Sequence, residues 1–206
     1  MASPRGNTLI EKFGFKDDDL KKPKHDDIMF WLESEVKKHE NTTDYFEFIG
    51  AYASLGKNIV SRSSRTTEKA AGEVRNILDE NRTMSLESLT WEYEIKKGNW
   101  TVGFIDLLTQ HKIYVPYPND SFYITTVFEV KTEIPTMGEL LRQIRAYEDS
   151  LYYQLRCSLD PCCNAKNLVL WRVVGPEISY KDSLRRQGVG SIVYPLDNVE
   201  SCEGIY

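Results

Sequence analysis

The sequence has few histidines, which limits the metal sites that it can build. It contains three in 206 residues. The pair His25-Asp26 could begin an HD phosphohydrolase site, but such a site requires further histidines, and only His39 and His111 remain. We therefore interpret the pair as the start of a helix, where an Asp side chain caps free backbone N–H groups.

Cysteines are also few, and their spacing is unfavourable for a structural metal. The chain has four of them, Cys157, Cys162, Cys163 and Cys202. Adjacent cysteines make tetrahedral coordination of one ion awkward, so free thiols or a stabilising disulfide are favoured. A disulfide inside a cell would indicate a hyperthermophilic host.

The chain lacks long apolar runs and an excess of positive charge. No stretch reaches the length of about 18 apolar residues that suggests a membrane helix, and residues 1–6 lack the apolar segment of a signal peptide. We expect a cytoplasmic protein without a membrane partner. The net charge of −5 argues against a protein that coats nucleic acid by charge alone.

The remaining sequence suits one folded domain after a polar arm. Residues 1–24 are polar and highly charged, which predicts a flexible arm, and residues 25–206 are expected to form a single domain. We expect an α/β fold with a central mixed sheet of about four or five strands flanked by helices. Apolar periodicity predicts helices near 25–40, 66–81 and 136–155 and, less clearly, 45–52; strands are expected near 91–95, 101–108, 123–131, 167–174 and 190–194.

Two expected strands carry acidic residues in apolar surroundings. Asp106 ends the stretch Gly103-Phe104-Ile105-Asp106, where an ionised carboxylate is costly unless a cation or hydrogen-bond donors compensate it. Glu129 and Lys131 are two residues apart on the next strand, so their side chains face the same way. These residues could bind a divalent metal, or they could form an ordinary pair of strands with a buried salt bridge.

A polar pair on the following helix adds to this pattern. Gln143 and Tyr147 are one helical turn apart and share a face. Together with the two strands, this order of residues resembles the PD-(D/E)XK nuclease superfamily, and the Gln-x-x-x-Tyr helix resembles its RecB-like branch. The resemblance covers about residues 90–150. Ile105 replaces the proline that often precedes the first acid, a change this branch tolerates.

Within the superfamily, the chain is similar to small nucleases of archaea and their spindle-shaped viruses. The similarity includes the stretch Pro23-Lys-His-Asp-Asp27. Some RecB-like nucleases hold an iron–sulfur cluster with one cysteine before the active site, and that arrangement is missing here. For a viral protein, the expected location is the host cell interior.

The resemblance implies a site for Mg²⁺ or Mn²⁺. Asp106 and Glu129 would be the ligands, with the backbone carbonyl of Val130. Nucleases of this type often place a further acid on the helix before the first strand, and Glu73 is our candidate for it. Glu94, on the expected strand at 91–95, is the competing candidate.

The resemblance also implies an activity and partners. Lys131 would orient or deprotonate the attacking water, Gln143 would hold water or a phosphate, and Tyr147 would fix the helix. We expect a magnesium-dependent deoxyribonuclease that hydrolyses phosphodiester bonds. Because no helicase or ATPase motif is present, endonucleolytic cleavage is favoured. A homodimer would suit cleavage of two DNA strands. The alternative is a catalytically silent DNA-binding or assembly module that keeps the fold.

Overall fold

The computed structural model describes most of the expected domain. Its described residues are 23–42, 44–51, 84–115, 120–133, 136–158, 166–178 and 180–195. Three predicted features lie outside these residues: nearly all of the polar arm, the helix expected near 66–81 with Glu73, and the cysteines Cys162, Cys163 and Cys202.

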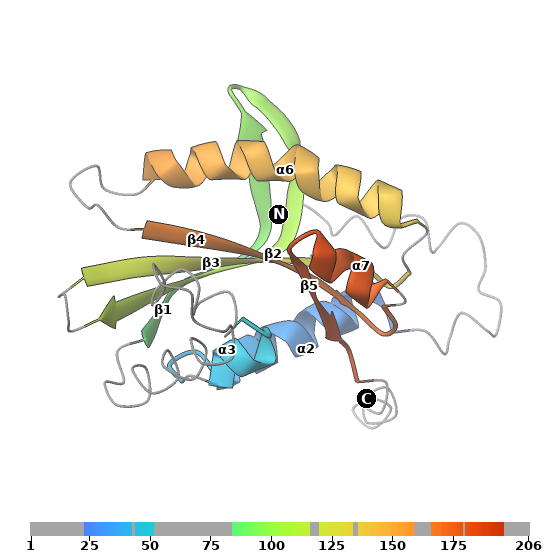
Figure 1. Cartoon of the computed structure of the whole chain (residues 1–206), viewed down its shortest axis with the longest axis horizontal. Helices are drawn as coiled ribbons and strands as arrows, with labels where there is room; N and C mark the ends of the chain where they lie inside the picture. Colours follow the sequence, from blue (N-terminus) through green and yellow to red (C-terminus); the bar gives the residue numbers. More distant parts are fainter. Residues whose placement is uncertain are drawn as a thin grey trace, which may run out of the picture.

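A mixed five-stranded sheet forms the centre of the protein, with strand order β1-β2-β3-β4-β5 (Figure 1). The strands are β1 (Met84–Lys97), β2 (Trp100–Val115), β3 (Asp120–Val130), β4 (Lys166–Gly175) and β5 (Val189–Val193). The first three are antiparallel neighbours, and β3, β4 and β5 run parallel. The expected α/β class with a mixed sheet is therefore confirmed.

Helices cover both faces of the sheet. The long helix α6 (Met137–Ser158) connects β3 to β4 across one face, while α2 (His25–Lys38) and α3 (Asp44–Phe48) lie on the other (Figure 1). The six-residue helix α7 (Lys181–Arg186) was not expected, because it is too short to show helical periodicity. No described helix is both long and apolar enough to cross a membrane.

Alternating side chains on β3 explain how the sheet separates two hydrophobic clusters. Phe128 and Val130 pack in one cluster with apolar side chains of α2 and α3. Val127 packs in a second cluster with Leu140 and Ile144 of α6, which we call the α6 cluster. Period-two alternation places Glu129 on the side of Val127, toward α6. The position of Glu129 therefore follows directly from the strand pattern.

Helix α2 begins at His25, as expected, but its cap differs from the prediction. The N-cap is Lys24, and its backbone N–H donates to Asp27 Oδ2 at 3.1 Å. The carboxylate therefore reaches back to the residue before the helix instead of capping it from the first position.

A buried polar group lies between β2, β3 and α3. The Tyr45 hydroxyl is 2.8 Å from Thr109 Oγ1 and donates to Thr126 Oγ1 at 2.9 Å. The His111 ring packs against Tyr45 with 4.0 Å between ring centroids, and neither of its nitrogens has a hydrogen-bond partner among the described residues. Burial lowers the pKa of His111 to about 4.

We predict that His111 makes the fold acid-sensitive. The unfolded chain binds a proton below about pH 6.5, but the folded imidazole binds it only near pH 4, so the contribution of His111 to the free energy of unfolding should fall by up to about 3 kcal/mol over that range. A His111→Phe variant keeps an aromatic ring and should lose this dependence. Urea unfolding between pH 7 and 4 measures it; equal pH slopes in both proteins would contradict the prediction.

Candidate active site

The two acidic strands separate at the residues that carry the acids. The β2–β3 ladder ends at the pair Leu107–Phe128, and the next residue on each strand is Asp106 or Glu129. The Val130 backbone N–H donates to Asp106 Oδ2 at 2.6 Å. The Asp106 side chain thus binds the backbone of β3 where the β2–β3 pairing stops. This contact holds the Asp106 carboxylate near Glu129, between the two separating strands.

The backbone around Asp106 is irregular. Ile105 and Leu108, three residues apart, both pack in the α6 cluster, while Leu107 packs on the opposite face. Glu92, on the neighbouring strand, has a φ of 48°, in the left-handed region that costs a non-glycine residue free energy. Strained backbone of this kind persists where surrounding structure holds it, often beside functional sites.

Glu129 is a buried carboxylate that is only half compensated. Its Oε1 accepts hydrogen bonds from Lys131 Nζ and Gln143 Nε2, each at 2.6 Å, and the side chain is 3% exposed. Its Oε2 is buried without a hydrogen-bond partner among the described residues. Burial, and then the charge of Asp106, raise the pKa of Glu129 to about 7. This environment favours binding a proton or a cation.

Helix α6 approaches the site closely because of a glycine. Gln143 Nε2, which binds Glu129, also lies 3.4 Å from the Tyr147 hydroxyl. A Cβ atom at Gly103 would overlap the ring and hydroxyl of Tyr147. The glycine at the start of Gly-Phe-Ile-Asp therefore leaves room for the tyrosine. The expected pairing of Gln143 and Tyr147 on one helix face is confirmed.

Lys131 is fixed by the end of β4. It follows the last residue of β3, and its backbone N–H donates to the Val174 carbonyl at 2.8 Å. A Cβ at Gly175 would collide with the Lys131 carbonyl, so glycine is required for this approach. The Lys131 side chain is 26% exposed, so its ammonium group pairs with Glu129 and still contacts solvent.

His25 joins the site, although the sequence interpretation assigned it only to a helix start. Its Nε2 lies 3.4 Å from Asp106 Oδ1. The hydrogen bond to Asp106 raises the pKa of His25 above its ordinary value. In the sequence, His25 stood out only as part of the stretch Pro23–Asp27, for which we noted a resemblance and no role in the site. Contact between residues so far apart in the chain cannot be deduced from local patterns.

The described donors suit a hard divalent cation with few protein ligands. No cluster of three or more His, Cys, Asp or Glu side chains arranged for a metal occurs in the described ranges. Mg²⁺ commonly binds through one or two carboxylates and keeps several waters. Asp106 and Glu129 fit this requirement, because Glu129 Oε2 has no hydrogen-bond partner among the described residues.

The two candidates for an additional acid differ in what the structure shows. Glu73 lies outside the described residues. Glu94 accepts a hydrogen bond from the Thr101 hydroxyl at 2.6 Å and pairs with Lys96 at 2.7 Å. Its carboxylate is therefore engaged within the β1–β2 hairpin. Val130, whose carbonyl is the predicted metal ligand, contacts Asp106 through its backbone N–H.

Comparison with models of known protein families gave no match, and comparison with curated proteins gave none. The chemistry assigned to the site therefore depends on its geometry.

We predict that Gly103→Ala displaces Tyr147 and, through it, Gln143. The added methyl group would overlap a ring held between a helix and a strand, so overpacking should cost about 1–3 kcal/mol of stability. Thermal unfolding measures this cost. Gly138→Ala is a matched control, because the added methyl group would meet only the flexible side chain of Arg142, at 3.7 Å. Equal effects of both substitutions would contradict the close approach.

We predict a second pH effect from Glu129. In metal-free protein the unfolded carboxyl ionises near pH 4.5 and the folded one near 7, so this residue destabilises the fold as pH rises through that range. Glu129→Gln cannot ionise and should be more stable than wild type by up to about 3 kcal/mol at pH 8. The two should be similar near pH 4.5. Urea unfolding in EDTA measures the difference, which isolates Glu129 from other titrating groups; a difference independent of pH would contradict the prediction.

Proposed function

We propose that this protein is a metal-dependent DNA nuclease of the PD-(D/E)XK type, related to the RecB-like branch. One observation carries the proposal. A buried Glu129 oxygen without a described partner lies on a carboxylate that also binds Lys131, beside Asp106. Two carboxylates in this position are costly unless a cation compensates them, and such a cation can act on a phosphodiester.

Hydrolysis of a phosphodiester requires positive charge and an activated water, because the substrate is an anion. Bound Mg²⁺ or Mn²⁺ polarises a phosphoryl oxygen and lowers the pKa of its water. Asp106 and Glu129 would hold the ion with the Val130 carbonyl. Asp106 keeps its orientation through the Val130 N–H, which leaves Oδ1 for the ion or for His25.

The chain's own donors surround the same point. Lys131 Nζ lies at the Glu129 carboxylate, where it can orient the attacking water and stabilise charge that develops on the phosphate. Gln143 Nε2 donates to the Glu129 carboxylate and to the Tyr147 hydroxyl, so the group of Gln143 that would hold a water is its amide oxygen. Tyr147, packed on Gly103, sets the distance between α6 and β2.

We propose DNA as the substrate and internal cleavage as the mode, inside the cell, with a homodimer as the active form. Several basic side chains on the described surface are suited to phosphates. Arg142, Arg185 and Arg186 are exposed, whereas Arg145 pairs with Glu148. Exposed arginines of this kind would attract DNA phosphates although the net charge of the chain is negative.

The second candidate is a silent DNA-binding or assembly module. It is favoured by the small number of acids, since only Asp106 and Glu129 meet in the described residues. Against it, a silent module gains nothing from a buried carboxylate that lacks full compensation.

The proposed function predicts strict dependence on the metal, on Asp106 and on Lys131. Wild type should cut DNA with Mg²⁺ or Mn²⁺ and not with EDTA, and Asp106→Asn and Glu129→Ala should show no detectable cleavage. Lys131→Ala should lower the single-turnover rate by about 10²–10³ while binding changes little. Lys38→Ala, in an exposed pair with Glu35, is the matched control and should match wild type.

Linear, circular, single-stranded and branched DNA should all be tested. A wild-type rate in Asp106→Asn would remove that residue from the site. If Lys131→Ala instead weakened binding and preserved the rate on bound DNA, the lysine would be a phosphate contact only. Absence of cleavage by wild type on every substrate with every metal would favour the silent module.

A further inference from the structure

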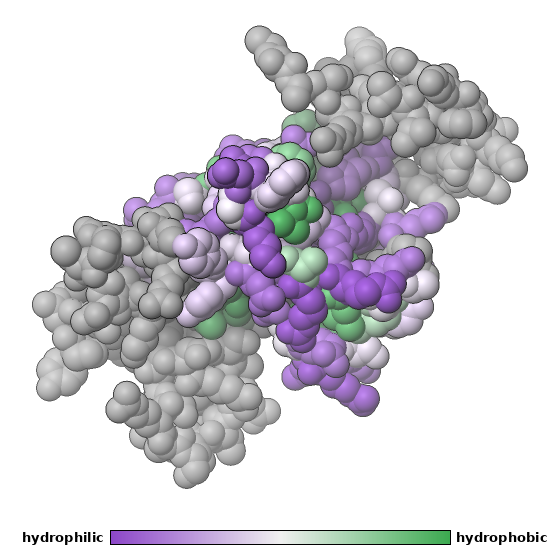
Figure 2. Space-filling view, turned by 90° about the horizontal axis from the view of Figure 1, so that it is seen from above, coloured by the Kyte–Doolittle hydropathy of each residue, from purple (hydrophilic) through white to green (hydrophobic). Residues whose placement is uncertain are grey.

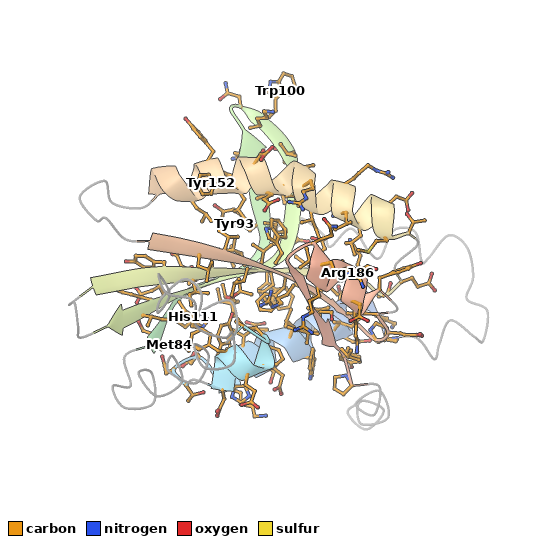
Figure 3. The ribbon with its side chains drawn as sticks, in the orientation of Figure 1. Met84, Tyr93, Trp100, His111, Tyr152 and Arg186 are labelled. Carbon is orange, nitrogen blue, oxygen red and sulfur yellow. The ribbon has the colours of Figure 1, made fainter. Side chains whose placement is uncertain are left out.

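The β1–β2 hairpin projects beyond helix α6 (Figures 1 and 3). Its tip is Lys97-Gly98-Asn99-Trp100, where Lys97 and Trp100 are the last paired residues and Gly98 adopts a φ of 61°. Trp100 is 81% exposed, which is unusual for so large an apolar ring. The fold thus presents an indole at the end of an arm.

The arm is held firmly rather than loosely attached. The Lys96 backbone N–H donates to Gln154 Oε1 at 3.0 Å, and Gln154 Nε2 donates to the Glu94 carbonyl at 3.2 Å. The Gln154 side chain thus both accepts a hydrogen bond from the backbone of β1 and donates one to it. Gln143, which binds Glu129, lies on the same helix, so the tip and the acids share one support.

The strand β2 connects the tip to the site directly. Trp100 and Asp106 are six residues apart on it, which is at most about 20 Å at the usual rise of a strand, because the pairing with β1 skips Val102. That distance equals about six base-pair steps of B-DNA. An arm of this length can contact the same nucleic acid that enters the site.

The chemistry of the tip suits a nucleotide better than a protein. A flat indole can stack on a base, and Lys97, also exposed, can meet a phosphate. One turn is small compared with the roughly 800 Å² that each partner buries in a stable protein interface. Seen from above the α6 side, the described surface is mostly hydrophilic with small separate hydrophobic spots, not a broad apolar area (Figure 2).

We propose that the β1–β2 hairpin is a nucleic-acid arm in which Trp100 stacks on an unpaired base and Lys97 contacts the adjoining backbone. In a duplex, both faces of each base are covered by its neighbours, so a single projecting ring stacks most readily where a base is unpaired. The arm deepens the proposed nuclease function. It selects DNA with a single-stranded segment about 20 Å from the bond that is cut. This selection rests on the proposed function, which places cleavage at Asp106 and Glu129.

The test compares binding of two DNA molecules by full-length protein. One is a blunt duplex, and the other is the same duplex with a single-stranded tail of about ten nucleotides. Binding is measured by fluorescence anisotropy in the Asp106→Asn background, so that DNA is not cut. Trp100→Ala should bind the tailed DNA about tenfold more weakly and the blunt duplex unchanged. Trp100→Phe should retain most of the affinity, because it keeps an aromatic face.

Tyr153→Ala is the matched control, since Tyr153 is another highly exposed aromatic residue, on α6. It should bind both DNA molecules like its parent. Unchanged binding of tailed DNA by Trp100→Ala would overturn the proposal, and so would an equal loss on both DNA molecules. Loss of a wild-type dimer in Trp100→Ala, seen by sedimentation, would assign the tip to a second copy of the chain and overturn it as well.

Cleavage by wild-type protein, measured separately, distinguishes this proposal from the proposed function. If wild type cuts DNA and Trp100→Ala binds tailed DNA normally, only the arm is wrong. If wild type cuts nothing but Trp100→Ala loses tailed DNA, the arm is supported as a binding element and the nuclease is wrong. A 2-aminopurine base placed along the tail should be quenched most strongly at the position that Trp100 covers.

Discussion

The site depends on one electrostatic constraint, which is that two carboxylates must lie together where the pairing of β2 and β3 stops. The local structure reduces this cost from several directions. Val130 donates its N–H to Asp106, while Lys131 and Gln143 donate to Glu129. These contacts require β2 to separate from β3 at Asp106. If the ladder continued, the Val130 N–H would pair with the backbone of β2 and could not bind the Asp106 carboxylate. One oxygen of Glu129 is still without a described partner, and there a cation has most to contribute.

The two hydrophobic clusters allow the protein to tolerate this site. Apolar side chains from both faces of the sheet pack against helices, so the strands are held in place even where their ladder ends. The close approaches at Gly103 and Gly175 depend on the same packing. The acids are thus placed by elements whose stability comes from elsewhere, which is the general condition for maintaining a costly polar site.

Local patterns in the sequence predicted the strands and the long helix that carry the acids, since alternation and helical spacing are short-range properties. The same patterns failed where the signal was interrupted. The polar residues from Thr109 to Lys112 interrupt the apolar pattern, so the predicted strand ended at 108 and missed the second half of β2. Helix α7 has only six residues, which is too short to show helical periodicity. The approach of His25 to Asp106 depends on how α2 crosses the sheet. No local pattern contains that information.

Helix α6 and strand β2 together connect the acids to the hairpin tip. The helix binds the site through Gln143 and the hairpin through Gln154, about 16 Å further along its axis. The strand spans a similar distance from Asp106 to Trp100. Because Gln154 binds the hairpin at Glu94 and Lys96, just before the tip, the helix limits how far the tip can move relative to the acids. Under the two proposals, a base held at the tip would fix which phosphate reaches the acids, so the shape of the DNA, rather than its sequence, would decide where it is cut.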